Sequence, residues 1–193
     1  MNLLLRNLLL ATFFAVLTAV GAMFSISIPI PFYVVPFSMQ TFVVLMSGLL
    51  LGPKYGPLSQ ALYIVMGLIG LPVFAGGAGG PQYVFSPTFG FLLGFVAASW
   101  VAGALAPRAK NFPHYALVCL AATVGLYVIA LPCFYVLVRF VAGTGITLVR
   151  ALQIAFLPFI IPDLIKVVAA GCLASRTIPM LKEAGLLPGG RAK

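Results

Sequence analysis

The sequence predicts an all-α membrane protein that crosses the bilayer several times, and two observations predict this fold class. Hydrophobic residues make up 63% of the 193 residues and charged residues only 7%, with a mean hydropathy of +1.19. A soluble domain of this size could not bury so much apolar surface. In addition, long apolar runs follow one another with short polar breaks, and a bilayer core about 30 Å thick needs about 20 such residues for each helix.

Six transmembrane helices account for the apolar runs. The first run ends in a proline-rich loop without charge, residues 29–36, and the second stops at Gly52 and Pro53, where proline cannot continue a helix. Pro158 suits the first turn of the last helix. The six predicted helices cover residues 3–28, 37–51, 57–71, 88–106, 115–141 and 158–176.

Two connecting segments are distinctive. Residues 71–90 are rich in glycine and proline and carry no charge, so we predict a glycine-rich loop between the third and fourth helices. Before the last helix, Thr147, Arg150 and Gln153 recur every three residues. This spacing predicts one polar face of a short helix at the membrane interface.

The basic residues predict the orientation of the chain. Placing both termini in the cytoplasm satisfies the positive-inside bias. The inner residues are then Arg6, Lys54, Arg108, Lys110, Arg176, Lys182, Arg191 and Lys193, and only Arg139 and Arg150 lie near the outer edges. We therefore expect one six-helix domain, residues 1–193, in the cytoplasmic (inner) membrane, with a basic cytoplasmic tail at residues 174–193. The glycine-rich loop would face outward.

Several function classes are excluded by composition and motifs. The net charge of +9 comes from scattered residues without a basic stripe, which argues against nucleic-acid binding. The three cysteines form no CxxC pair and His114 has no second ligand nearby, so no metal site or disulfide framework is indicated. The chain has no paired carboxylates and no nucleophile with a base, and residues 76–80 lack the lysine of a Walker A motif. We expect neither an enzyme nor a cofactor.

One charged pair, Asp163 and Lys166, falls inside the last predicted helix. Each charge costs about 2.5 to 3.5 kcal/mol on insertion scales, and residues three apart share a helix face, so both must point to the bundle interior or to a wet cavity. A carboxylate accepts N–H donors and an ammonium attracts an anion, so the pair fits a small ligand with an amide-like end and a carboxylate. The alternative is a structural pair that neutralises itself.

Other candidate binding residues lie near the predicted outer face. Gln40 begins the second predicted helix. The glycine-rich loop could bring its backbone and aromatic rings over a pocket, or it could be a simple turn between two helices. The candidates in this loop are Phe74, Gly76, Gly77, Gln82 and Tyr83.

The first predicted helix carries three alanines, Ala11, Ala15 and Ala19, at strict four-residue spacing. Small residues at this spacing allow close packing of helices in a membrane. They could serve packing within the chain or docking of another membrane subunit, and the spacing alone does not decide.

Four further blocks of the sequence are specific, namely SMQTFVVLMSGLLLGPKYGPLSQALY, GLIGLPVFAGGAGGPQ, SPTFGFLLGF and PDLIKVVAA. Together with the alanine series of the first helix, they resemble the BioY family, the biotin-specific substrate-binding (S) subunits of energy-coupling-factor (ECF) transporters, over nearly the whole chain. The resemblance implies a six-helix subunit that binds biotin from outside, beneath the loops between helices one and two and between helices three and four. It also implies an ECF transmembrane coupling subunit and its ATPases as partners, besides membrane lipid.

The resemblance also implies roles for single residues. Asp163 and Lys166 stand at the family's DxxK positions, where Asp163 would accept N–H from the ureido ring and Lys166 would hold the valerate carboxylate or balance Asp163. Ala11, Ala15 and Ala19 look like the family's AxxxA surface for the coupling subunit. Some relatives place an asparagine and an arginine in or after the third loop, and this chain has neither within residues 76–100.

Two other functions remain open at this point. One is an autonomous facilitator or secondary carrier for biotin or a similar small carboxylate, although a coupled carrier usually needs several intramembrane acids and this chain has one. The other is an accessory membrane subunit in which the charged pair only fixes helix packing. Such a subunit would not be stabilised by any small ligand.

Overall fold

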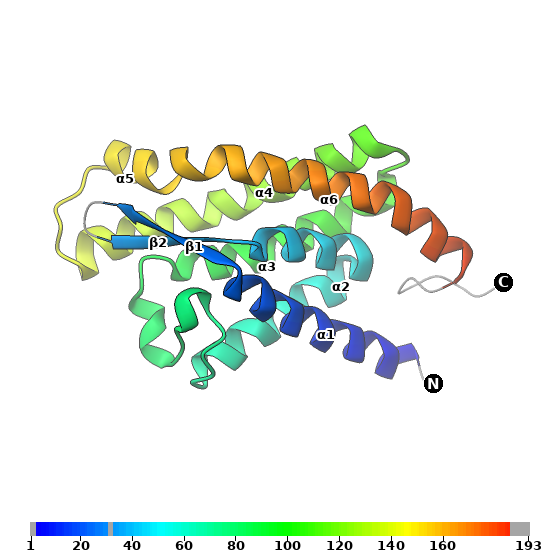
Figure 1. Ribbon diagram of the computed structural model, residues 1–193, viewed down its shortest axis with the longest axis horizontal. Coiled ribbons are helices and arrows are strands. Elements are labelled where there is room, and N and C mark those ends of the chain that lie inside the picture. Colours follow the sequence, from blue (N-terminus) through cyan, green and yellow to red (C-terminus); the bar gives the residue numbers. More distant parts are fainter. Residues whose placement is uncertain (1–2, 31–32, 186–193) are drawn as a thin grey trace.

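The computed structural model describes residues 3–30 and 33–185 (Figure 1). Its long elements are helices that lie lengthwise beside one another, with the beginning of the first helix and the end of the last helix at one end and the strands and α5 toward the opposite end. The elements are α1 (Leu3–Met23), β1 (Ser25–Ile30), β2 (Tyr33–Ser38), α2 (Gln40–Leu68), α3 (Phe89–Leu105), α4 (Phe112–Val136), α5 (Leu148–Ala155) and α6 (Leu157–Glu183). The predicted all-α class is confirmed.

Four helical stretches in the described part of the chain are long and apolar enough to cross a membrane. They are Leu3–Met23, Phe89–Arg108, Phe112–Val141 and Leu148–Glu183. In the bundle, α2 packs against α1 and α3, while α4 packs against α3 and α6. Several apolar helices of this length make the chain a multi-pass membrane protein.

Helix α2 is a helical hairpin rather than one straight rod. Gly52 leaves the helical conformation with φ 74° and ψ −175°, and Pro53 follows it. The amide nitrogen of Gln60 donates to the hydroxyl of Ser47 at 3.1 Å, although the residues are 13 apart in sequence. A straight helix would separate them by about 20 Å at 1.5 Å per residue. The chain therefore reverses at Gly52, where the sequence predicts the second helix to end.

Glycine allows the two halves of α2 and helix α3 to touch through their backbones. A Cβ atom added at Gly48 would lie 2.3 Å from the backbone oxygen of Ser99, and one at Gly56 would lie 2.9 Å from the Cα atom of Gly48. The hydroxyls of Ser47 and Ser99 are hydrogen-bonded at 2.9 Å across the same contact. Small residues and buried hydroxyls of this kind hold helices together in a membrane.

The first helix is shorter than predicted. It was expected over residues 3–28, but α1 ends at Met23 and the chain continues into β1, which pairs antiparallel with β2 so that Ser25 lies opposite Ser38. The predicted loop at residues 29–36 therefore falls within a β-hairpin, apart from residues 31–32, which lie outside the described part. The alternation of serine with β-branched isoleucine in SISI suits a strand, and Pro29 prevents a helix from continuing.

The last helices lie close to their predicted positions, but the start of α4, the end of α4 and the end of α6 differ from the prediction. Asn111 caps α4 by accepting the backbone N–H of His114, so this helix begins at Phe112, and a π-turn at Leu137–Val141 follows its end. The short helix predicted around Thr147 is present as α5, capped by the Thr147 hydroxyl. Helix α6 continues to Glu183, so the first part of the predicted tail is helical, and residues 186–193 lie outside the described residues.

Replacing Gly48 by alanine should destabilise the bundle, because the added methyl group would meet the backbone of Ser99, which cannot rotate away. Overpacking of this kind costs about 1 to 3 kcal/mol. Thermal unfolding of the purified protein in detergent would show a lower midpoint for Gly48→Ala. The matched control is Gly125→Ala on α4, whose Cβ would meet its nearest neighbour, a Val101 methyl, at an ordinary 3.4 Å. Equal midpoints for wild type and Gly48→Ala would contradict the close backbone contact.

Candidate functional site

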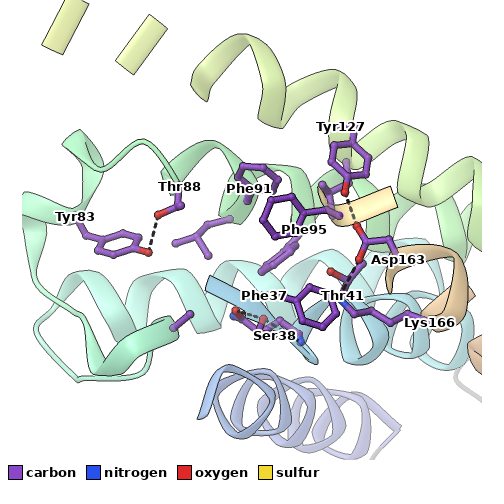
Figure 2. Close-up of a pocket in the computed structure, with 15 residues that line it drawn as sticks. Phe37, Ser38, Thr41, Tyr83, Thr88, Phe91, Phe95, Tyr127, Asp163 and Lys166 are labelled. Carbon is purple, nitrogen blue, oxygen red and sulfur yellow. Dashed lines mark hydrogen bonds and ion pairs between the residues drawn. The ribbon is translucent and has the colours of Figure 1, made fainter. Parts of the chain in front are cut away.

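A cavity opens among α2, α3, α4 and α6, next to the end of β2 (Figure 2). Its empty volume is about 560 Å³ when the open space at its mouth is counted. It is lined by Phe37, Ser38, Gln40, Thr41, Ala75, Tyr83, Thr88, Phe91, Leu92, Phe95, Leu126, Tyr127, Phe159, Asp163 and Lys166. Aromatic and aliphatic walls with a few polar groups are typical of a site for a small organic ligand.

Asp163 and Lys166 form the charged part of the cavity wall. Both lie on α6, one turn apart, with side chains almost completely buried, and the Lys166 ammonium is 2.9 Å from one oxygen of the Asp163 carboxylate. The Tyr127 hydroxyl, which comes from α4, donates a hydrogen bond to the other carboxylate oxygen. The carboxylate is therefore held by a donor on each oxygen, and each oxygen keeps further acceptor capacity.

The Lys166 ammonium also lies over an aromatic ring. Its nitrogen is 4.1 Å from the centre of the Phe37 ring, a cation–π distance, and Phe37 in turn lies 6.3 Å from the ring of Phe159. Phe37 belongs to β2, so this contact joins the β-hairpin to the charged pair on α6. The ammonium is thus fixed between a carboxylate and an aromatic face.

A second polar group lines the cavity at the start of α2. The Gln40 carbonyl oxygen accepts from the Ser38 hydroxyl at 2.8 Å, and the Gln40 amide nitrogen donates to the Tyr63 hydroxyl at 2.6 Å. From the segment between α2 and α3, the Tyr83 hydroxyl is hydrogen-bonded to Thr88 at 2.9 Å. The cavity therefore has a neutral hydrogen-bonding part as well as an ion pair.

Four of the predicted binding residues come together in this cavity, namely Gln40, Tyr83, Asp163 and Lys166. They come from three parts of the sequence that are far apart, the start of α2, the glycine-rich segment and α6. The prediction that the pair on α6 faces the bundle interior or a cavity agrees with its position. Contact of these residues with a ligand stays a prediction.

The other four predicted binding residues do not line the cavity. Phe74 is 1% exposed and packs between Tyr63 and Tyr83, with ring centres 5.5 Å and 4.5 Å away. Its role in the structure is to support the cavity wall from behind. Gln82 is exposed and donates to the backbone oxygen of Gly79 at 2.8 Å, which holds the segment in shape.

Gly76 and Gly77 form a turn beside the cavity. Both have positive φ angles, 78° and 74°, which favour glycine. A Cβ atom at either position would meet nothing within 4 Å. Between α2 and α3 the chain forms two short 3₁₀ turns, Ala75–Gly77 and Pro81–Phe85, and Ala75 is the residue of the first turn that lines the cavity.

Sequence reasoning missed most of the aromatic wall and the partner of Asp163. The cavity is lined by Phe37 of β2, Phe91 and Phe95 of α3 and Phe159 of α6, and no spacing in the sequence distinguishes these residues from other apolar ones. Tyr127 gave a weak signal, because it places a hydroxyl group in the middle of an apolar helix. Its pairing with Asp163, 36 residues later, depends on how α4 and α6 pack.

The three alanines of α1 face the interior of the protein and do not form the exposed docking surface that the resemblance implies. Ala11 and Ala15 are both 0% exposed and belong to the core, and Ala19 is partly buried against it. Thr18 on the same face donates to Gln60 of α2 at 3.3 Å, so this face of α1 packs against α2. Internal packing is therefore the role that the structure gives to Ala11 and Ala15. The exposed face of α1 carries Leu5, Leu9, Phe13, Val16 and Val20.

Comparisons with known proteins agree on one family. The model of the BioY family matches residues 1–183. A protein of Thermotoga maritima named biotin transporter BioY is 39% identical over 173 residues, which cover 89% of this chain and 95% of that protein. A Rhodobacter capsulatus protein of the same name is 35% identical over 96% of this chain and 99% of its own length.

A solved structure is also similar to this chain. It is the crystal structure of the S-component for biotin from an ECF-type ABC transporter, with a TM-score of 0.76 and 26% sequence identity. The match covers 91% of this chain and 92% of that one. By family model, sequence identity and fold, this chain belongs to the BioY family.

Proposed function

We propose that this chain binds biotin in the cavity beside Asp163 and Lys166 and acts as the substrate-binding subunit of an ECF-type transporter in the cytoplasmic membrane. Support comes from its place in a family whose curated members are named biotin transporters and from its similarity to an S-component for biotin. The single observation that carries the proposal is a buried carboxylate and ammonium facing a cavity lined by aromatic and hydrogen-bonding side chains.

The chemistry of biotin matches the cavity wall. Its ureido ring offers two N–H donors and a carbonyl acceptor, and its valerate chain ends in a carboxylate. Asp163 accepts N–H donors, and the ammonium of Lys166, with three N–H groups, can reach an anion while it stays bound to Asp163. The rings of Phe91, Phe95 and Phe159 supply apolar surface for the fused ring system and the chain.

The proposed topology has six membrane spans with both termini in the cytoplasm. The reversal at Gly52 divides α2 into two antiparallel halves, residues 40–51 and 53–68, which would add two shorter spans to the four long ones. The beginning of α1 and the end of α6 lie at one end of the bundle, and the β-hairpin and α5 lie toward the other (Figure 1). The cavity beside β2 and the glycine-rich segment then faces outward, while Arg6 and Lys182 face the cytoplasm.

The proposed partners are an ECF transmembrane coupling subunit and its ATPases. This chain has no nucleotide-binding motif, so in an ECF-type transporter ATP hydrolysis would be carried out by the separate ATPase subunits. Because Ala11 and Ala15 are buried, docking in the membrane would use exposed side chains such as those of Phe13 and Val16 on α1. In the free subunit these apolar side chains would contact membrane lipid.

Biotin binding tests the proposal directly, by calorimetric titration of the detergent-purified protein. One-site binding is expected for the wild type, with affinity reduced at least about 10-fold in Asp163→Asn and Lys166→Met, because each change leaves a buried charge without its partner. The matched controls are Glu183→Gln and Lys182→Met, which remove the same charges at exposed positions near the end of α6. They should bind like the wild type.

Two results would contradict the proposal. Absence of binding heat together with absence of thermal stabilisation by biotin would exclude biotin as the ligand. Equal affinity of the wild type and both cavity variants would show that biotin binds elsewhere on the protein.

Tyr127→Phe tests the second donor to Asp163. Loss of the hydroxyl removes one hydrogen bond to the carboxylate and leaves the packing of the ring against Phe91 and Phe156 in place. A hydrogen bond to a charged group contributes about 1.5 to 3 kcal/mol, so a fall in biotin affinity of about 10-fold or more is expected in the same titration. An unchanged affinity would mean that Tyr127 does not help to hold Asp163 for the ligand.

A further inference from the structure

Tyr63 lies behind Gln40, away from the cavity. Its side chain is 0% exposed and is not among the residues that line the cavity. Its hydroxyl has two neighbours, the Gln40 amide nitrogen at 2.6 Å and the backbone oxygen of Val73 at 3.1 Å. Tyr63 therefore touches a cavity residue on one side and the start of the glycine-rich segment on the other.

The direction of these hydrogen bonds follows from the donors that each group has. A backbone carbonyl can only accept, so the single hydrogen of the Tyr63 hydroxyl goes to Val73. The Tyr63 oxygen must then accept from Gln40, which requires the NH₂ group of the Gln40 amide on that side. The Gln40 carbonyl oxygen consequently lies on the side of Ser38, another residue of the cavity wall, whose hydroxyl donates to it at 2.8 Å.

We propose that Tyr63 is a positioning residue for ligand recognition, which fixes the Gln40 carboxamide so that its oxygen is presented to an N–H donor of the bound ligand. An amide can otherwise rotate by half a turn and exchange its donor for its acceptor. The ion pair of Asp163 and Lys166 supplies recognition of charge, and the fixed amide adds recognition of a neutral N–H group. The inference rests on the proposed function, because it assigns a role within the same cavity.

Tyr63 also supports a second part of the cavity wall, the part that Tyr83 forms. Its ring meets Phe74 edge to face, and Phe74 packs against Tyr83, which lines the cavity. Phe74 fits closely over Gly67 of α2, since a Cβ atom at Gly67 would lie 2.0 Å from the Phe74 ring. One buried tyrosine thus holds Gln40 through its hydroxyl and Tyr83 through its ring. Tyr63→Phe separates these effects because it removes only the hydroxyl.

A double-mutant cycle tests the positioning role. Biotin affinity is measured for the wild type, Tyr63→Phe, Gln40→Ala and the double variant, with Tyr115→Phe as the matched control. Tyr115 is a buried tyrosine of α4 that does not line the cavity. We expect Tyr63→Phe to weaken binding about 5- to 20-fold when Gln40 is present, and less than 2-fold when Gln40 is alanine. Tyr115→Phe should bind like the wild type.

The outcomes separate the inference from the proposed function. A wild type that binds biotin together with Tyr63→Phe of equal affinity would overturn the positioning role and leave the function intact. The same would follow if Tyr63→Phe weakened binding by an equal factor with and without Gln40, since the effect would then be structural. A wild type without biotin binding would overturn both.

A measurement on the wild type covers the case in which Tyr63→Phe does not fold. In protein labelled with ¹⁵N-glutamine, the side-chain amide signal of Gln40 should exchange with deuterated water at least about 10-fold more slowly than that of the exposed Gln82. Addition of biotin should shift the Gln40 signal. Exchange as fast as that of Gln82, or no shift at saturating biotin, would overturn the proposal.

Discussion

The ion pair between Asp163 and Lys166 sits among apolar helices, and the arrangement of the cavity follows from the need to satisfy its charges. Tyr127 from α4 donates to the free carboxylate oxygen, and the Phe37 ring from β2 covers the ammonium. Three elements that are distant in sequence therefore meet at one pair of charges. Removing the partner of a buried charge costs far more free energy than removing the partner of an exposed charge. This pair therefore restrains how α4, α6 and the β-hairpin can move relative to one another.

The side of the cavity that α2 forms is held by different interactions. The halves of α2 and helix α3 touch through glycine and serine residues, and hydrogen bonds link the hydroxyls of Ser47 and Ser99 and the side-chain amide of Gln60. Because this packing is tight, it restricts movement of the part of α2 that lines the cavity. Two hydrogen bonds of the Tyr63 hydroxyl connect α2 further to the Gln40 side chain and to the backbone of Val73. A site with a charged wall on α6 and a neutral, fixed wall on α2 can recognise both ends of a small amphipathic molecule.

Much of this organisation could be predicted from the sequence, because membrane helices obey strong one-dimensional rules. A long apolar run predicts a membrane helix, and the Gly52 and Pro53 break predicts a helix end. The charged pair at Asp163 and Lys166 predicts a position facing the bundle interior or a cavity. The β-hairpin after α1 could not be predicted in the same way, since most of its first strand lies in a run apolar enough to continue the helix and most of its second strand lies in a proline-rich segment that predicts a loop. The buried face of Ala11 and Ala15 and the pairing of Tyr127 with Asp163 depend on which helices become neighbours, and no local pattern encodes that choice.

The neutrality of the charged pair has an electrical consequence. The charges of Asp163 and Lys166 cancel, so the empty cavity carries no net charge within the membrane. A cavity that holds a biotin carboxylate would carry one negative charge. Moving one charge across the membrane field involves about 2.3 kcal/mol per 100 mV. In a cell whose interior is negative, this work opposes inward movement of the anion. If biotin binds in this cavity as proposed, binding alone cannot accumulate it, and an external source of work is needed to complete each cycle.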